Sequence, residues 1–215
     1  MARIVVLGAG GQVGRSIVAE AVRRGHEVTA VDQDQNALKG VPRQATAVTG
    51  DVTARDMVQQ QAQNADVVVV ALAGSARPEH ANTARAVVEV ANKLGANKAP
   101  AVIHIGNGGL LENADGERIV DTQEFPAAER KEALDQADAL DVLRAAKHNL
   151  KWTCIVPPPR NFGPGRRREA YRTAGDRPVT DAQGNIGISY EDFAFAVLDE
   201  VEKPRFRNKR YTVGY

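Results

Sequence analysis

The residues best suited to chemistry are a group of glycines near the start of the chain and one aspartate that follows them. Gly8, Gly11 and Gly14 come directly after the apolar run 3–7, and Asp32 stands at the end of the next such run. Glycine permits a tight turn and a close backbone approach, and the N-terminus of a following helix offers unpaired N–H groups and a positive dipole to a pyrophosphate. A carboxylate about 20 residues further on can accept hydrogen bonds from an adenosine ribose. The pattern predicts a dinucleotide-binding site, and the alternative is a tight turn that binds nothing.

The spacing of the glycines selects one version of this motif. The strict G-x-G-x-x-G pattern needs a glycine at position 13, where Val13 stands, and the chain instead fits G-x-x-G-x-x-G with Gly10 as an addition. Small residues after the apolar run 66–72 let a cofactor sugar lie close to the backbone. The residues predicted to contact the cofactor are Gly8, Gly10, Gly11, Gln12, Val13, Gly14, Asp32, Gln33, Asp51, Val52, Ala71, Leu72, Ala73, Gly74, Asn107 and Pro157.

Asp32 also decides the predicted choice between the two nicotinamide cofactors. A carboxylate at the end of the second strand suits a free ribose 2′-hydroxyl and repels a 2′-phosphate. The next residue is Gln33, and the only nearby cation, Arg43, lies beyond a predicted turn. We therefore predict that NAD(H) binds in preference to NADP(H).

Hydrophobic periodicity predicts the elements that must hold these residues. Short apolar runs predict strands at 3–7, 27–31, 45–49, 66–72, 101–105, 152–156 and 211–213. Helical spacing predicts helices at 53–63 and about 81–94, and others after the glycine turn, near Pro126 and after Ser189. This alternation predicts one α/β domain over residues 1–215, a doubly wound parallel sheet (Rossmann fold) with a small C-terminal elaboration.

Three residues within these elements need an interpretation of their own. Asp51 lies at the carboxyl end of the third strand, where ligands gather, so it can meet an adenine amine, cap helix 53–63, or do both. His104 falls inside a predicted strand, and we interpret it as a hydrogen-bonded structural histidine rather than a catalytic one. Leu134 is predicted to face inward from the helix that begins near Pro126.

Composition and charge argue against several classes of partner. Lysine and arginine number 28 against 27 acidic residues, a formal net charge of +1, which disfavours general binding to nucleic acid or to a membrane surface. No apolar stretch approaches the roughly 20 residues that span a bilayer, and no secretory leader is recognisable. The single cysteine, Cys154, makes no intrachain disulfide or metal cluster. We predict a metal-free cytoplasmic protein, and the sequence leaves open whether it forms a homodimer.

A second group of residues forms the predicted acceptor pocket. Asn107 lies in the long segment 106–125, which is predicted to be a loop beside the expected cofactor site, and such loops are often functional. The arginine-rich segment 160–168 follows the sixth strand. We expect Phe162 to stack on a planar acceptor and Arg160 or Arg166 to hold an anionic one. The plain alternatives are a loop turn for Asn107, a core aromatic for Phe162 and solvated charges for the arginines.

Stretches spread over nearly the whole chain carry a family resemblance. They are the glycine turn 8–14, the tripeptide 50–52, the turn 71–74 and the C-terminal stretches 152–158, 188–194 and 210–213. The pattern resembles the atypical short-chain dehydrogenase/reductases, close to the NmrA-like, biliverdin reductase B-like and NADH-flavin reductase-like proteins. The resemblance implies a Rossmann fold that binds NAD(P).

The catalytic pair of many short-chain dehydrogenases is absent from the sequence. Those enzymes use Tyr-x-x-x-Lys, in which the lysine lowers the pKa of the tyrosine so that it can pass a proton. Residues 129–131 of this chain, at the expected place, are Glu-Arg-Lys, and Asn107 with two glycines replaces the usual serine. The four tyrosines all lie far downstream, at Tyr171, Tyr190, Tyr211 and Tyr215. We therefore nominate no catalytic residue and expect no conventional alcohol–ketone interconversion.

Three functions fit this pattern. The first is an NAD(P)H-dependent oxidoreductase that transfers hydride to a flavin, a quinone or a similar small acceptor, because such acceptors are already electrophilic. The second is a non-catalytic NAD(P)-binding sensor, as NmrA-like proteins can be. The third is a sugar-nucleotide epimerase-like enzyme, which the short C-terminal part disfavours.

Overall fold

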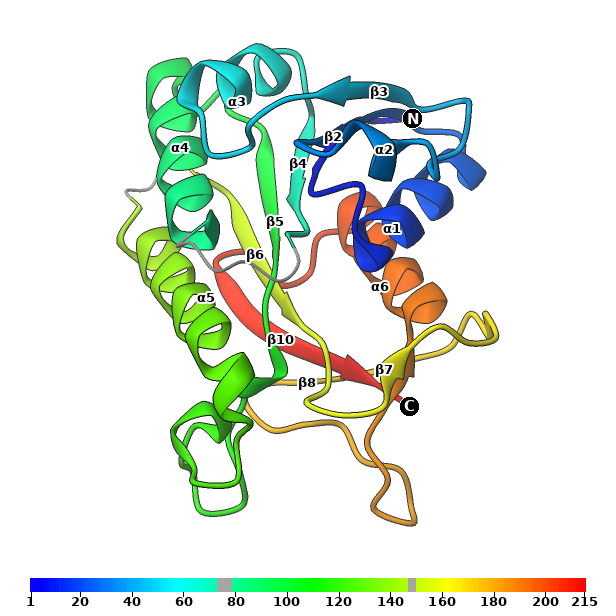
Figure 1. Cartoon of the computed structure of the whole chain (residues 1–215), viewed down its shortest axis with the longest axis vertical. Coiled ribbons are helices and arrows are strands. Elements are labelled where there is room, and N and C mark those ends of the chain that lie inside the picture. Colours follow the sequence, from blue (N-terminus) through cyan, green and yellow to red (C-terminus); the bar gives the residue numbers. More distant parts are fainter. Residues whose placement is uncertain (73–78, 147–149) are drawn as a thin grey trace.

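The computed structural model describes residues 1–72, 79–146 and 150–215, and it shows a twisted sheet with helices on both faces (Figure 1). The strands of the main sheet in this part of the chain are β1 (Arg3–Leu7), β2 (Glu27–Asp32), β3 (Thr46–Thr49), β4 (Val67–Val70), β5 (Ala101–Ile105), β6 (Trp152–Val156), β8 (Arg172–Ala174) and β10 (Lys209–Gly214). Their order is β3-β2-β1-β4-β5-β6-β10-β8. All neighbouring strands are parallel except β10 and β8. The doubly wound parallel sheet predicted from the sequence is confirmed.

The helices form one layer on each face of this sheet. They are α1 (Gln12–Arg23), α2 (Gln35–Leu38), α3 (Arg55–Ala62), α4 (Glu79–Leu94), α5 (Ala127–Ala145) and α6 (Tyr190–Glu202), with the short 3-10 helices η1 (Gly108–Leu110) and η2 (Ile119–Asp121). α1 and α6 pack on one face, and α3, α4 and α5 pack on the other. The C-terminal elaboration adds a separate pair of parallel strands, β7 (Phe162–Gly163) and β9 (Ile188–Ser189).

The central strand β4 shows why the sheet is covered on both sides. Its four residues are all valines and all buried. Because side chains alternate along a strand, Val67 and Val69 join the core beneath α1 and α6, while Val68 and Val70 join the core beneath α3, α4 and α5. An unbroken apolar run of this kind is typical of a parallel strand buried on both faces.

The order of the strands also determines where a ligand-binding crevice is expected. The chain moves outward from β1 through β2 to β3 and then returns to the other side of β1 with β4. Ligands of open α/β sheets bind where the order reverses, outside the carboxyl ends of the strands. Gly8 follows β1 and Leu72 follows β4 at this point, so the predicted cofactor turn lies at the switch between the two halves of the sheet.

The structure corrects several local predictions. Leu134 is 40% exposed, so its inward orientation was wrong, because the buried stripe of α5 runs through Ala133, Ala137 and Leu140. The helix expected at 53–63 begins only at Arg55. β7, β8 and β9 were not predicted because they are two or three residues long and carry no apolar alternation.

Candidate functional site

Gly8 and Gly14, on either side of the turn after β1, lie against backbone atoms that leave no room for a side chain. Gly8 has a φ of +85°, and a Cβ atom placed on it would lie 2.6 Å from the carbonyl oxygen of Ala71. A Cβ atom on Gly14, near the start of α1, would lie 2.2 Å from the carbonyl oxygen of Gly8. Both contacts are too short for real atoms. These glycines therefore let α1 pack directly onto the end of β1 and bring its positive N-terminus to the crevice.

Gly10 brings the backbone of the turn against the carboxylate of Asp32. The Gly10 N–H donates to Oδ2 at 2.9 Å, and the Asp34 N–H donates to Oδ1 at 3.0 Å. A Cβ atom on Gly10 would lie 2.8 Å from Oδ2 and 2.6 Å from the Cβ atom of Ala37. The carboxylate is therefore held in one orientation, and its oxygens keep lone pairs that can accept hydrogen bonds from ligand hydroxyls. The predicted contact of this carboxylate with an adenosine ribose remains a prediction.

A cavity of about 230 Å³ lies at the carboxyl ends of β1, β2 and β4. Its lining consists of Gly8, Gly10, Gly11, Asp32, Gln33, Asp34, Ala37, Val52, Leu72 and Glu79. Sequence reasoning missed Asp34, Ala37 and Glu79. Asp34 and Ala37 follow Asp32 within five residues, a signal that could have found them. Glu79 comes from the start of α4, and no local pattern connects it with the glycine turn.

Other residues predicted to contact the cofactor lie outside this lining. Gln12 is exposed at the first turn of α1, and Val13 packs against the core. Ala71 is buried at the end of β4. Ala73 and Gly74 lie outside the described residues. Cofactor contacts of these residues remain predictions.

Asp51 holds the turn that precedes α3. Its Oδ1 atom accepts hydrogen bonds from the N–H of Thr53 at 2.8 Å and from the Thr53 hydroxyl at 2.7 Å. The N-cap residue of α3 is Ala54, and no side chain caps that helix. Asp51 therefore stabilises the turn before the helix rather than its first turn, and its expected contact with adenine remains a prediction.

The loops after β5 and β6 pack against each other beside the crevice. Asn107 Oδ1 accepts a hydrogen bond from the Gly109 N–H at 2.7 Å and so caps η1. A Cβ atom on Gly108 would lie 2.4 Å from the Cα atom of Pro159. Pro157, two residues before Pro159, is buried. Asn107 thus forms the loop turn that was its plain alternative, and the two loops form one continuous wall.

The arginine-rich segment 160–168 separates into residues with different surroundings. Arg160 is exposed. Phe162 packs edge-on against the rings of Tyr190 and Phe193, at centroid distances of 4.7 and 5.0 Å. It also lines a groove together with Arg166. Phe162 is therefore partly a core aromatic, as its plain alternative expected, while one of its sides remains available to a ligand.

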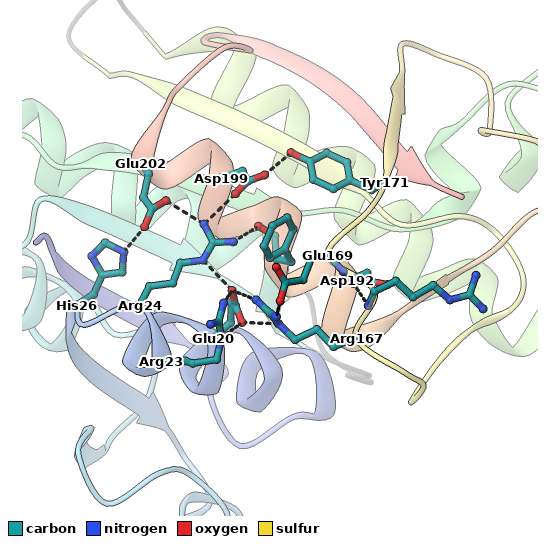
Figure 2. A network of polar contacts seen from close by, with 12 residues as sticks. Glu20, Arg23, Arg24, His26, Arg167, Glu169, Tyr171, Asp192, Asp199 and Glu202 are labelled. Carbon is teal, nitrogen blue, oxygen red and sulfur yellow. Dashed lines mark hydrogen bonds and ion pairs between the residues drawn. The ribbon is translucent and has the colours of Figure 1, made fainter.

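Arg167 belongs to a network of ion pairs that sequence reasoning missed (Figure 2). Glu20 of α1 is 5% exposed, and its carboxylate accepts hydrogen bonds from Arg23, Arg24 and Arg167 at 2.7 to 3.0 Å. Arg24 also forms ion pairs with Asp199 and Glu202 of α6. The network ties the helix that follows the glycine turn both to α6 and to the arginine-rich segment.

The protonation of Glu20 is coupled to this network. Burial raises the pKa of Glu20, but the hydrogen bonds from the three arginines outweigh burial and lower it to about 2. The lowered pKa means that the ionised carboxylate stabilises the folded state. This contribution is complete above the ordinary pKa near 4.5 and is lost as the pH falls through 2.

We expect the substitution Glu20→Gln to lower the free energy of unfolding by about 2 kcal/mol at pH 7, because it leaves three guanidinium groups without their shared anion. The matched control is Glu169→Gln, since Glu169 pairs with Arg167 but is 59% exposed. Urea unfolding at pH 7 and pH 3 measures both. The deficit of Glu20→Gln should shrink at pH 3, and an equal deficit at both pH values would contradict the role of the charge.

His104 is buried as expected but does not make the expected hydrogen bond. It is 1% exposed, and neither of its ring nitrogens has a hydrogen-bond partner in the described part of the chain. Its ring lies edge-on to the ring of His80 of α4, with centroids 6.2 Å apart. Burial, followed by the nearby His80, lowers the pKa of His104 to about 3. The interpretation as a hydrogen-bonded histidine was wrong, because β5 buries this side chain with its ring edge-on to that of His80 and with no partner for either nitrogen in the described residues.

This histidine should make the protein sensitive to mild acid. Below pH 6.5 the histidine of the unfolded chain binds a proton, whereas His104 of the folded protein does not. The free energy of unfolding therefore falls as the pH drops from 6.5 towards 3. The slope is about 1.4 kcal/mol per pH unit, so between pH 7 and pH 5 the wild type should lose about 2 kcal/mol through this residue. We expect His104→Phe to remove that loss in urea unfolding. Equal losses in both proteins would contradict the assignment.

The fold, the glycine turn and the fixed aspartate define a dinucleotide-binding protein of the Rossmann class. A family described as NAD(P)H-binding matches residues 8–204. The chain therefore belongs to the NAD(P)H-binding family. In the described part of the chain, none of the helices has both the length and the apolar character that a membrane crossing requires.

Three relatives resemble the chain over its full length. The uncharacterised protein YwnB of Bacillus subtilis is 32% identical over 98% of this chain and 97% of its own length. A candidate exported protein from Burkholderia pseudomallei is 33% identical, with a TM-score of 0.85 and 100% coverage of both chains. SP1627 of Streptococcus pneumoniae, a candidate NADH-flavin reductase, is 31% identical, with a TM-score of 0.82 and coverage of 100% and 99%. The resemblance to NADH-flavin reductase-like proteins is confirmed.

Proposed function

We propose that the protein is an NAD(P)H-dependent oxidoreductase that transfers hydride to a flavin, a quinone or a similar small planar acceptor. The observation that carries the proposal is the carboxylate of Asp32, which Gly10 orients at the switch point of the sheet in a chain of the NAD(P)H-binding family. A nicotinamide cofactor, when bound, supplies the hydride. The description of the pneumococcal relative as a candidate NADH-flavin reductase supports the same chemistry.

Within this proposal the chain uses NAD(H) in preference to NADP(H). Asp32, Asp34 and Glu79 bring three carboxylates to the cavity lining, and no lysine or arginine of the described residues lines it. Arg43 is exposed and outside the lining. A 2′-phosphate would add nearly two negative charges to this acidic cavity, whereas a 2′-hydroxyl can donate a hydrogen bond to a carboxylate.

The acceptor side of the site requires positioning more than proton transfer. A flavin or quinone is electrophilic and can take its proton from water, so the residues need only hold it at near-attack distance from the cofactor. Arg130, near the expected place of the missing catalytic pair, donates to the carbonyl oxygens of Val120 and Thr122 and so holds the loop after β5. We propose that Asn107, Pro157 and Phe162 shape the wall against which the acceptor lies.

One observation favours a second function, a cofactor-binding sensor without turnover. The groups that stand near the expected proton donor are already engaged in the fold, as Arg130 and Asn107 show. A sensor needs only the dinucleotide site that we propose around Asp32 and does not need an acceptor site.

The test is NADH oxidation by the purified protein with flavins, quinones and small carbonyl compounds, together with calorimetric binding of NADH and NADPH. We expect tight NADH binding and turnover of a flavin or a quinone but not of simple ketones. Tight binding without turnover of any acceptor would establish the sensor instead. Failure to bind either cofactor would overturn both functions.

A further inference from the structure

A larger groove lies beside the loop that follows β6. Its volume is about 650 Å³, and it is formed by β7, β9, the segments that flank them and the ring of Tyr215. Asn161 lines the groove and follows Pro159, which packs against the loop after β5, by two residues. Phe162, which we place in the acceptor wall, also lines the groove.

Consecutive arginines at the edge of the groove point in opposite directions. Arg166 and Arg168 line the groove, whereas Arg167 between them reaches away from it to Glu20. Successive side chains of an extended segment point to opposite sides, so anchoring the middle arginine presents the two outer ones together. The network of Figure 2 thus explains why two guanidinium groups border one groove.

The carboxylates around the groove accept hydrogen bonds from backbone N–H groups, and Asp181 is itself part of the groove lining. Asp181 accepts hydrogen bonds from the backbone N–H groups of Gln183 and Asn185. Glu191 accepts one from the Gly165 N–H at 2.9 Å. Asp192 is fully buried and accepts from the N–H groups of Arg168 and Glu169. In the described part of the chain no carboxylate pairs with either outer guanidinium, so their charges face the groove.

The groove also offers flat apolar surfaces. Its lining includes one side of Phe162 and the ring of Tyr215, which carries the Arg168 guanidinium 4.4 Å above its centre. The Tyr215 hydroxyl donates to Asp192 at 2.6 Å, and this bond holds the ring in place. Two aromatic surfaces next to two arginines that form no ion pair in the described part of the chain suit a ligand that is planar at one end and doubly negative at the other.

We propose that the acceptor is a planar molecule that carries a phosphate monoester, and that Arg166 and Arg168 bind its phosphate. This inference rests on the proposed hydride transfer and names the substrate class for it. Arginine binds phosphate through paired N–H donors, and a phosphate monoester carries between one and two negative charges at pH 7. The pair FMN and riboflavin tests the proposal directly, because both share one ring system and only FMN has the phosphate.

The test compares FMN and riboflavin in two assays, fluorescence quenching for binding and NADH oxidation for turnover. The wild type should bind FMN about tenfold more tightly than riboflavin. Arg166→Gln and Arg168→Gln should each weaken the binding of FMN several-fold and leave the binding of riboflavin unchanged. Arg207→Gln, an exposed arginine outside the groove, is the matched control and should change neither. Thermal unfolding confirms that each variant folds, and Arg166 is the safer variant since its side chain does not stack on Tyr215.

The outcomes separate this inference from the proposed function. Arginine-dependent FMN binding without NADH oxidation would support the groove assignment and reject hydride transfer. Equal use of FMN and riboflavin, with turnover, would support hydride transfer and reject the phosphate assignment. Failure of both flavins to bind, or equal losses for both in the arginine variants, would also overturn the assignment. The FMN preference should decline below pH 6, where the phosphate gains a proton.

Discussion

Gly10→Ala should weaken NADH binding by roughly a hundredfold while the protein remains folded. The added Cβ atom would lie 2.6 Å from the Cβ atom of Ala37 and 2.8 Å from Oδ2 of Asp32. Relief of these contacts must displace the carboxylate that is expected to hold the ribose, and the loss of one charged hydrogen bond together with overpacking costs about 3 kcal/mol. Calorimetric titration with NADH measures the effect.

The matched control for this substitution is Gly175→Ala, because a Cβ atom there meets nothing within 4 Å. It should bind NADH like the wild type. Adding Ala37→Gly to Gly10→Ala removes the short contact with the Ala37 Cβ atom and should restore part of the affinity. If Gly10→Ala binds NADH normally, the ligand does not depend on the orientation of Asp32 by Gly10.

The double substitution Asp32→Ser with Gln33→Arg should reverse the cofactor preference, with a change of roughly a hundredfold in the ratio of NADH to NADPH affinity. The carboxylate accepts backbone hydrogen bonds on both oxygens and therefore cannot turn away from a 2′-phosphate. Serine removes that repulsion, and arginine at position 33 of the lining supplies a cation. Parallel titrations with NADH and NADPH measure the ratio.

Two single variants make this result interpretable. Gln33→Arg alone should improve NADPH binding only slightly, because Asp32 remains. Arg43→Gln should change neither affinity, since Arg43 lies outside the cavity lining. A wild-type protein that already prefers NADPH would show that the three carboxylates of the lining do not govern the choice.

The parts of the fold that could be predicted from the sequence are those set by short-range patterns. The valines of β4 alternate between two cores, and a run of this kind is recognisable in one strand alone. Gly8 and Gly14 are needed where β1 turns into α1, so their spacing indicated the turn and the nearby carboxylate. Most of the cavity lining follows from these local rules.

The remaining features depend on contacts between distant parts of the chain. Glu79 reaches the cavity because the first turn of α4 lies at its edge, and Arg167 meets Glu20 across 147 positions of sequence. The neighbouring sequence does not distinguish an arginine that anchors a segment from one that faces a groove. His104 shows the converse, since the sequence indicated burial but not that its nitrogens would lack partners.

The place of β10 in the sheet has a consequence for how the chain folds during synthesis. β8 pairs in the described sheet only with β10, which in turn lies between β8 and β6. A nascent chain that ends before Lys209 can assemble β1 to β6, but it leaves the edge of β6 uncovered and β8 unpaired. Such an edge invites association with other chains. Completion of the sheet therefore waits until β10 has left the ribosome, and ribosome-bound chains should need protection from aggregation until then.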